Sequence, residues 1–144
     1  MIVRLIEYFN SRNTKVITVK GVRKYDLQPA AKDSSLFLSA GADRVWVVAD
    51  REMMSFRQVE DEAEAKEILV KDFEDADMVL LEGYYFDHVP IIEVFDSRKH
   101  RRLKFALDRL AAVVADCKVT DRIPCFDKND ISRIAHFMEA YDGQ

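Results

Sequence analysis

The stretch from Asp75 to Tyr85 limits most strongly what this chain can fold into. Its acidic start is followed by four apolar residues, Met78-Val79-Leu80-Leu81, and such an unbroken run is typical of a strand that is buried on both faces. Glu82 and Gly83 end the run, and glycine permits a sharp turn or a close approach to a ligand. Because open α/β sheets bind ligands beyond the carboxyl ends of their strands, Glu82 either holds a magnesium ion or a water there, or only marks where the strand meets solvent.

The remaining chain alternates between helical and strand-like patterns. Apolar spacing and caps predict helices at about residues 2–10, from the cap Asp33-Ser34-Ser35 to Gly41, at 61–73, and from 131 to about 138. Strands are expected at residues 16–19, 45–49, 78–81, 89–95, 111–116 and 123–126, and the strand at 45–49 is expected to be buried. Residues 53–56 fit either a helical turn or an edge strand. This order predicts an α/β fold with a mainly parallel sheet and helices on both faces. Since no linker divides the chain, we expect one domain over residues 1–144.

Composition excludes several classes of function. The formal net charge is −4, which gives no indication of a nucleic-acid or anionic-membrane partner. No apolar run approaches the roughly 20 residues of a membrane span, and the N-terminus has no secretory pattern. Cys117 and Cys125 are too few for a disulfide framework, so we expect core thiols in a reducing cytoplasm. His88, His100 and His136 lack the spacing of a zinc site.

Three segments carry a resemblance to a known family: Val16–Lys20; Lys32-Asp33-Ser34 with Ala40-Gly41-Ala42; and Asp77–Gly83 with Pro90–Val94. They resemble, in order, the second strand, the "GKDS…aGA" segment and the "DLVLVEG…P.iEV" block of molybdopterin-guanine dinucleotide biosynthesis protein B, MobB. The tail through the last helix continues in register. The resemblance covers Lys15 to Asp142 and implies a P-loop-like fold and an accessory, GTP-binding role in molybdenum cofactor assembly.

One departure from the family bears directly on function. The chain contains no G-x-x-x-x-G-K-[ST], and its first glycine is Gly21. The family's first strand and phosphate loop would precede the helix at residues 2–10, so either the true start lies upstream or this is a relative that has lost nucleotide hydrolysis. Without that loop, the backbone cradle and the lysine that hold the β- and γ-phosphates are missing. The sheet would also lack an interior strand, and the unpaired edges predict a homodimer.

The resemblance nevertheless nominates residues for contact with nucleotide or phosphate. They are Lys20, Arg23, Lys32, Asp33, Ser34, Glu82 and Gly83, with Asp33 and Glu82 as the candidates for Mg²⁺. Asp33 and Ser34 fit a plain helix N-cap equally well, and Ala31 stands where the family has glycine before the lysine.

Two further clusters have open interpretations. The basic segment Ser97–Lys104 either contacts a phosphate or an acidic partner, or forms a solvated surface. The aromatic residues Tyr84, Tyr85 and Phe86 either stack on a base or a pterin, form a protein-contact patch, or cover the core.

Together these observations predict an accessory protein of molybdenum cofactor biosynthesis that binds partners and hydrolyses GTP weakly or not at all. The expected partners are a second copy of the chain and the cofactor nucleotidyltransferase or molybdoenzyme clients, and the possible ligands are GTP with Mg²⁺ and a molybdopterin derivative. The alternatives are a P-loop enzyme whose phosphate loop lies outside these residues, and a scaffold without a ligand.

Overall fold

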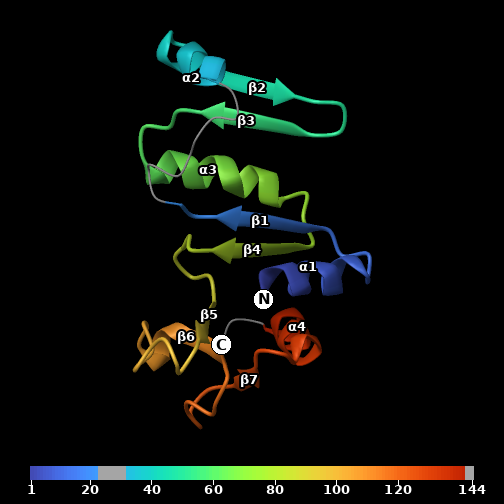
Figure 1. The fold of residues 1–144 in the computed structure, drawn as a ribbon, viewed down its shortest axis with the longest axis vertical. Coiled ribbons are helices and arrows are strands. Elements are labelled where there is room, and N and C mark those ends of the chain that lie inside the picture. Colours follow the sequence, from blue (N-terminus) through green and yellow to red (C-terminus); the bar gives the residue numbers. More distant parts are fainter. Residues whose placement is uncertain (23–31, 142–144) are drawn as a thin grey trace. The chain divides into compact units, whose positions relative to one another are not determined.

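A computed structural model of the chain describes residues 1–22 and 32–141, with only the backbone described for Lys32. The elements follow one another in the order α1 (Ile2–Asn10), β1 (Val16–Lys20), α2 (Lys32–Ser39), β2 (Arg44–Val48), β3 (Met53–Arg57), α3 (Glu62–Phe73), β4 (Met78–Glu82), β5 (Ile91–Phe95), a 3-10 helix (Leu107–Arg109), β6 (Leu110–Ala115), β7 (Cys125–Asp127) and α4 (Ile131–Ala140) (Figure 1). The α/β fold class is therefore confirmed, and the segment that fitted two structures, residues 53–56, is a strand. In the described part of the chain, no helix is long and apolar enough to cross a membrane.

The chain divides into two compact units. The first comprises Met1–Thr18, Ala76–Leu80 and Tyr85–Gln144, and the second comprises Val19–Asp75 and Leu81–Tyr84. The strands β1 and β4 pair in a two-stranded sheet and point the same way in Figure 1. Their first residues belong to the first unit and their last residues to the second. The interpretation of residues 1–144 as one domain stays a prediction.

The core of the first unit is built on β6, which lies between β5 and β7 in a parallel sheet. Successive side chains of a strand face opposite ways, so β6 supplies two hydrophobic clusters. Val114 packs with Leu5 and Phe9 of α1 and with Ile134 of α4. Val113 and Ala115 belong to the other cluster, together with partly buried residues of the loops around it. The strand that is buried on both faces is thus β6.

This result corrects the expectation for the stretch Met78–Leu81. Within β4 only Leu80 is buried, and the other residues are half-buried or exposed. The physical reason lies in the pairing: among the described strands β4 has one hydrogen-bonded neighbour, β1, whereas β6 has two. The apolar run therefore predicted the strand correctly, but the burial predicted for it was too high.

The second unit contains the antiparallel pair β2–β3 and the helices α2 and α3. Val45 lies opposite Phe56 in the pairing, and it is the only buried residue of β2. The strand expected at residues 45–49 is confirmed as β2, but its expected burial was wrong because side chains alternate across this two-stranded ribbon: Trp46 and Val48 are 51% and 71% exposed. Gly41, at φ +102°, follows α2, in agreement with its predicted role as the stop of that helix.

Candidate functional site

The carboxyl ends of β1 and β4 meet at Gly21 and Glu82. The Gly21 N–H donates a hydrogen bond of 2.8 Å to the backbone oxygen of Glu82. Beside it, Lys20 Nζ lies 3.8 Å from Glu82 Oε2, and the two side chains are 70% and 57% exposed. An ion pair that is this exposed and this long contributes little stability, so both charged groups remain accessible to a ligand.

Two glycines allow this close meeting of the strand ends. A Cβ atom on Gly21 would stand 2.3 Å from the backbone oxygen of Gly83, which no real contact permits. Gly83 itself has φ +66°, a conformation in which other residues are strained. The positions that the sequence marked as a turn at the end of a strand are therefore sterically reserved for glycine.

A cavity of about 470 Å³ in the second unit adjoins these strand ends. Its polar and aromatic lining comes from β1, β2, β3 and the turn after β4: Lys20, Gly21, Arg44, Trp46, Arg57 and Tyr84. The helix α3 adds an apolar wall through Ala65, Ile68 and Leu69. The volume falls within the range of about 300–1,000 Å³ that is usual for small-molecule sites.

The cationic side chains of this cavity differ in their surroundings. Arg57 donates a hydrogen bond of 3.2 Å to Glu64 and lies 4.0 Å from Asp43, so carboxylates already balance its charge. The guanidinium of Arg44 lies 5.7 Å from the ring centroid of Trp46, a cation–π distance. Asp72 is the only acidic residue among the described residues that line the cavity. Of the three cationic side chains in the described lining, Lys20 and Arg57 thus face carboxylates, and Arg44 forms no ion pair with a residue that the structure describes.

The structure groups some of the predicted site residues and leaves others apart. Lys20, Glu82 and Gly83 are brought together at the strand ends. Asp33 is exposed and Ser34 is buried on α2, and no described side-chain contact joins either of them to Glu82. Arg23 and the side chain of Lys32 lie outside the described residues. Among the residues that the structure describes, no group of three or more His, Cys, Asp or Glu side chains could hold a metal ion.

Sequence reasoning missed Arg44, Trp46 and Arg57 because it treated residues 45–49 as a buried strand. A signal was present in the alternation of residues 44–47, where polar or amphipathic Arg44 and Trp46 alternate with Val45 and Val47. Such alternation is typical of a strand with one accessible face.

Acidic residues in or just after the neighbouring strands β5 and β6 accept hydrogen bonds from the basic segment 97–104. Arg98 donates two side-chain hydrogen bonds, of 3.0 and 2.9 Å, to the Asp96 carboxylate. These bonds hold the pKa of Asp96 well below its usual range. The Ser97 backbone N–H, helped by its hydroxyl, likewise lowers the pKa of Asp116. Glu93 accepts hydrogen bonds from the backbone N–H groups of Lys104 and Phe105. These contacts hold the two ends of the loop in place and pair the charge of Arg98 with Asp96.

Tyr84 and Tyr85, the first two aromatic residues after Gly83, have different surroundings. Tyr84 lines the cavity of the second unit. Tyr85 packs edge-on against Phe105, with ring centroids 5.6 Å apart, and Lys104 Nζ lies 5.5 Å from the centroid of the Tyr85 ring. Of the interpretations given for this cluster, Tyr85 therefore fits the cover of the core, and Tyr84 is the one placed to meet a ligand.

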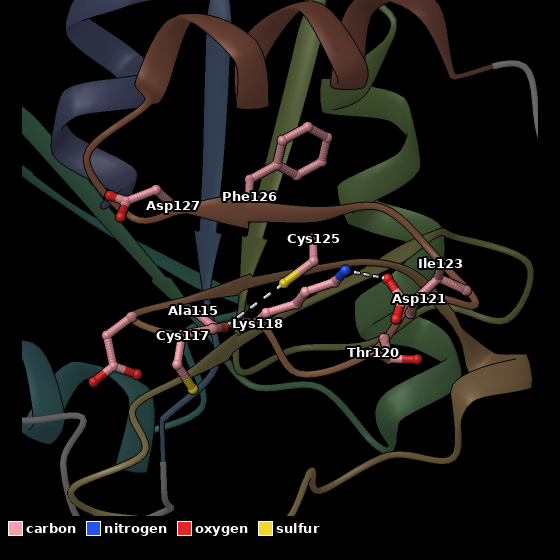
Figure 2. A pocket seen from close by; sticks show the side chains of 10 residues that line it. Ala115, Cys117, Lys118, Thr120, Asp121, Ile123, Cys125, Phe126 and Asp127 are labelled. Carbon is pink, nitrogen blue, oxygen red and sulfur yellow. Dashed lines mark hydrogen bonds and ion pairs between the residues drawn. The ribbon is translucent and has the colours of Figure 1, made fainter.

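A second cavity, of about 460 Å³, lies in the first unit at the carboxyl ends of β6 and β7 (Figure 2). Lys118 and Asp121 form an ion pair at its edge. Cys117 is exposed and Cys125 is partly buried, with Cys125 Sγ 3.9 Å from the backbone oxygen of Cys117. The expectation that both thiols lie in the core was thus wrong for Cys117, which follows β6 after that strand has left the buried region.

The chain matches one family model and resembles several solved structures. The family model described as molybdopterin guanine dinucleotide synthesis protein B matches residues 1–116. A solved molybdopterin-guanine biosynthesis protein B is 23% identical, with a TM-score of 0.66 over 96% of this chain and 88% of its own. A MobB homologue from Bacillus stearothermophilus is 16% identical, with a TM-score of 0.62 over 96% of this chain and 84% of its own. MobB from Bacillus subtilis is 17% identical, with a TM-score of 0.61 over 94% and 86%. No curated protein matched the chain.

Proposed function

The chain belongs to the molybdopterin guanine dinucleotide synthesis protein B family, whose members are accessory proteins of molybdenum cofactor biosynthesis, and we propose that these 144 residues perform that accessory role by binding partners, with weak or no hydrolysis of GTP. Sequence and geometry both support a chain that binds partners but does not catalyse phosphoryl transfer efficiently.

The observation that carries the proposal is the ion pair between Lys20 and Glu82 at the strand ends. Phosphoryl transfer depends on several preorganised positive groups around the phosphates. Within the 144 residues there is no G-x-x-x-x-G-K-[ST], and the lysine at the strand ends already faces a carboxylate at 3.8 Å. A phosphate that approached Lys20 would be repelled by Glu82 unless a divalent cation lay between them. This arrangement supports weak, magnesium-dependent contact rather than turnover.

The same reasoning defines where a guanine nucleotide would contact the chain. Its phosphates would lie near Lys20 and Gly83, and Mg²⁺ would lie at Glu82. The other candidates, Arg23, Lys32, Asp33 and Ser34, are proposed from the family resemblance alone. A site composed of single side chains, without a backbone cradle, favours millimolar affinity.

The proposed partners are a second copy of the chain and the enzyme that attaches the nucleotide or receives the finished cofactor. Exposed apolar side chains on the pair β2–β3 support association: Trp46, Val48, Met53 and Met54 are all exposed. A two-stranded ribbon is marginally stable alone and gains from a further neighbour. Both cysteines are free thiols, which is consistent with a place in the reducing cytoplasm.

Two measurements on the same chain test the proposal. The chain should restore the guanine dinucleotide cofactor of a molybdenum enzyme in a bacterium whose own family member is deleted, and the purified chain should hydrolyse GTP no faster than buffer. Failure to raise the cofactor content at normal expression would refute the accessory role. Calorimetry that shows micromolar, magnesium-dependent GTP binding, abolished by Glu82→Gln, would refute the division between binding and chemistry.

A further inference from the structure

The basic segment 97–104 concentrates positive charge in a chain that is otherwise strongly acidic. With its histidine neutral the segment carries five positive charges, whereas the whole chain carries −4, so the other residues together carry −9. Arg98 alone forms an ion pair with a residue that the structure describes, Asp96, at 2.9 Å. The other four cations are exposed and form no ion pair with a described residue: Lys99, Arg101, Arg102 and Lys104.

Two carboxylates hold the ends of this segment. At its start, Asp116 accepts hydrogen bonds of 3.0 Å from both the N–H and the hydroxyl of Ser97. At its end, Glu93 accepts hydrogen bonds of 2.6 and 3.0 Å from the backbone N–H groups of Lys104 and Phe105. A segment whose ends are fixed before binding loses less conformational entropy when a partner docks. The cations between the two ends are therefore presented on a preorganised loop.

An aromatic surface lies beside the last cation of the segment. Lys104 Nζ lies 5.5 Å from the ring centroid of Tyr85 and 5.1 Å from that of Phe105. Tyr85 covers the core with part of its ring, yet the residue is 44% exposed. Arginine and aromatic side chains are enriched in protein–protein interfaces. The combination of unpaired cations with an accessible ring fits a contact surface for another protein.

We propose that the basic segment 97–104 docks an acidic segment of a partner protein, with carboxylates at Arg101 and Arg102 and an apolar side chain on Tyr85. The proposal deepens the partner-binding role, on which it rests, by naming the surface and the chemistry of the partner. A guanidinium group binds a carboxylate through two parallel N–H donors, and Arg98 already binds Asp96 in this way within the segment.

The charge of the remaining chain favours a short acidic segment over a long polyanion. Eight extended residues span at most about 25–30 Å, so a peptide of similar length contacts the basic segment and little else. A nucleic acid or an anionic membrane presents its negative charge over a larger surface, which the net negative charge of the other residues repels. A compact group of carboxylates avoids most of that repulsion.

Fluorescence anisotropy with a labelled peptide tests the proposal on the full chain. The probe is a short peptide of glutamates with a central phenylalanine, and its control has glutamines in place of the glutamates. We expect a saturable rise in anisotropy with the glutamate peptide at low ionic strength and at least tenfold weaker binding of the glutamine peptide. Added salt should weaken the binding of the glutamate peptide, because the contacts are exposed ion pairs.

Variants with equal net charge separate the segment from general attraction. Arg101→Gln combined with Arg102→Gln should weaken the binding of the glutamate peptide at least tenfold. The matched control combines Arg51→Gln with Arg122→Gln, two exposed arginines outside the segment, and should leave the binding unchanged. Tyr85→Ala should weaken the peptide with phenylalanine about threefold or more and leave a peptide with glycine at that position unchanged. Circular dichroism checks that each variant is folded.

Four results would overturn the inference. The first two are no saturable binding of the glutamate peptide at millimolar concentration and equal effects of the two double variants. The third is tighter binding of single-stranded RNA or of phosphatidylserine vesicles than of the peptide, abolished by the variant of Arg101 and Arg102. The fourth is a lower sedimentation coefficient of that variant, which would assign the segment to a second copy of the chain.

These binding results do not depend on GTP hydrolysis or on cofactor content in cells. A chain that restores the cofactor but does not bind the glutamate peptide refutes this inference alone. A chain that binds the peptide through the segment but restores nothing refutes the accessory role alone.

Discussion

Replacement of Gly21 by alanine is the substitution that most directly tests the meeting of the two strand ends. The added Cβ would stand 2.3 Å from the Gly83 oxygen and 2.7 Å from the Gly83 carbonyl carbon. Both atoms belong to the backbone, so no side-chain rotation can relieve the contact. The ends of β1 and β4 must separate, and the 2.8 Å hydrogen bond from the Gly21 N–H to the Glu82 oxygen is stretched or lost.

The magnitude follows from these two losses. Forcing an extra methyl group into a packed position costs about 1–3 kcal/mol, and one lost backbone hydrogen bond costs about 1 kcal/mol more. We therefore expect Gly21→Ala to lower the free energy of unfolding by about 2–4 kcal/mol. For a domain of this size that corresponds to a fall of roughly 5–15 °C in the melting temperature.

Urea unfolding followed by far-ultraviolet circular dichroism measures this loss, with Gly41→Ala as the matched control. Gly41 also has a positive φ, +102°, but a Cβ there would meet nothing within 4 Å. The control should therefore cost only the backbone strain of about 1–2 kcal/mol. A Gly21→Ala variant within about 0.5 kcal/mol of the parent chain, or more stable than Gly41→Ala, would show that the strand ends do not approach as described.

Three other perturbations have defined outcomes. Glu82→Gln should change the free energy of unfolding by less than about 0.5 kcal/mol, because the pair with Lys20 is exposed; a larger loss in urea unfolding would give Glu82 a structural role. The hydrogen bonds from Arg98 lower the pKa of Asp96 in the folded chain below its unfolded value of about 3.9. The ionised Asp96 therefore stabilises the fold above pH 4, and this contribution is lost as the pH falls through the pKa of Asp96 in the folded chain. The unfolding midpoints of the parent chain and Asp96→Asn should accordingly differ at pH 7 and converge toward pH 2, and a constant difference would contradict this cause. Sedimentation should show a homodimer at micromolar concentration whose melting temperature rises with concentration, and Met54→Lys on exposed β3 should give a folded monomer; a parent chain that is monomeric throughout would contradict the proposed association.

Local interactions account for the elements that were predicted well. The spacing of Leu5 and Phe9 places both on one face of α1, and that face is the buried one. Asp130 directly precedes the helix that was predicted to begin at residue 131, and it accepts a hydrogen bond of 3.2 Å from the Arg133 N–H at the start of α4. Asp61 caps α3 in the same way through the Glu64 N–H, at 2.9 Å. Each of these contacts joins residues three or four positions apart, so the sequence alone contains the information.

The candidate site was predicted in part. The rule that ligands bind at the carboxyl ends of strands singled out Glu82, and the family resemblance added Lys20 and Gly83. The structure brings these three residues together. The accessibility of Trp46 was missed because the apolar residues of this strand were given more weight than the alternation of residues 44–47. The exposed face of β2 was therefore mistaken for a buried one, and with it Arg44 and the cavity were missed.

Apart from residues 53–57, the sequence by itself determined the type and approximate position of the helices and strands that the structure describes, because periodicity, caps and turn residues act over a few neighbours. Its segments also carried the family resemblance. Only the tertiary structure decided which strands pair, since that pairing joins distant residues: the Lys15 N–H donates to the Asp77 carboxylate across 62 positions. It also decided that β6 and not β4 is buried on both faces, and that a lone tryptophan lies beside an arginine in a cavity. Burial and cavities depend on what packs against an element, and that information is distributed over the whole chain.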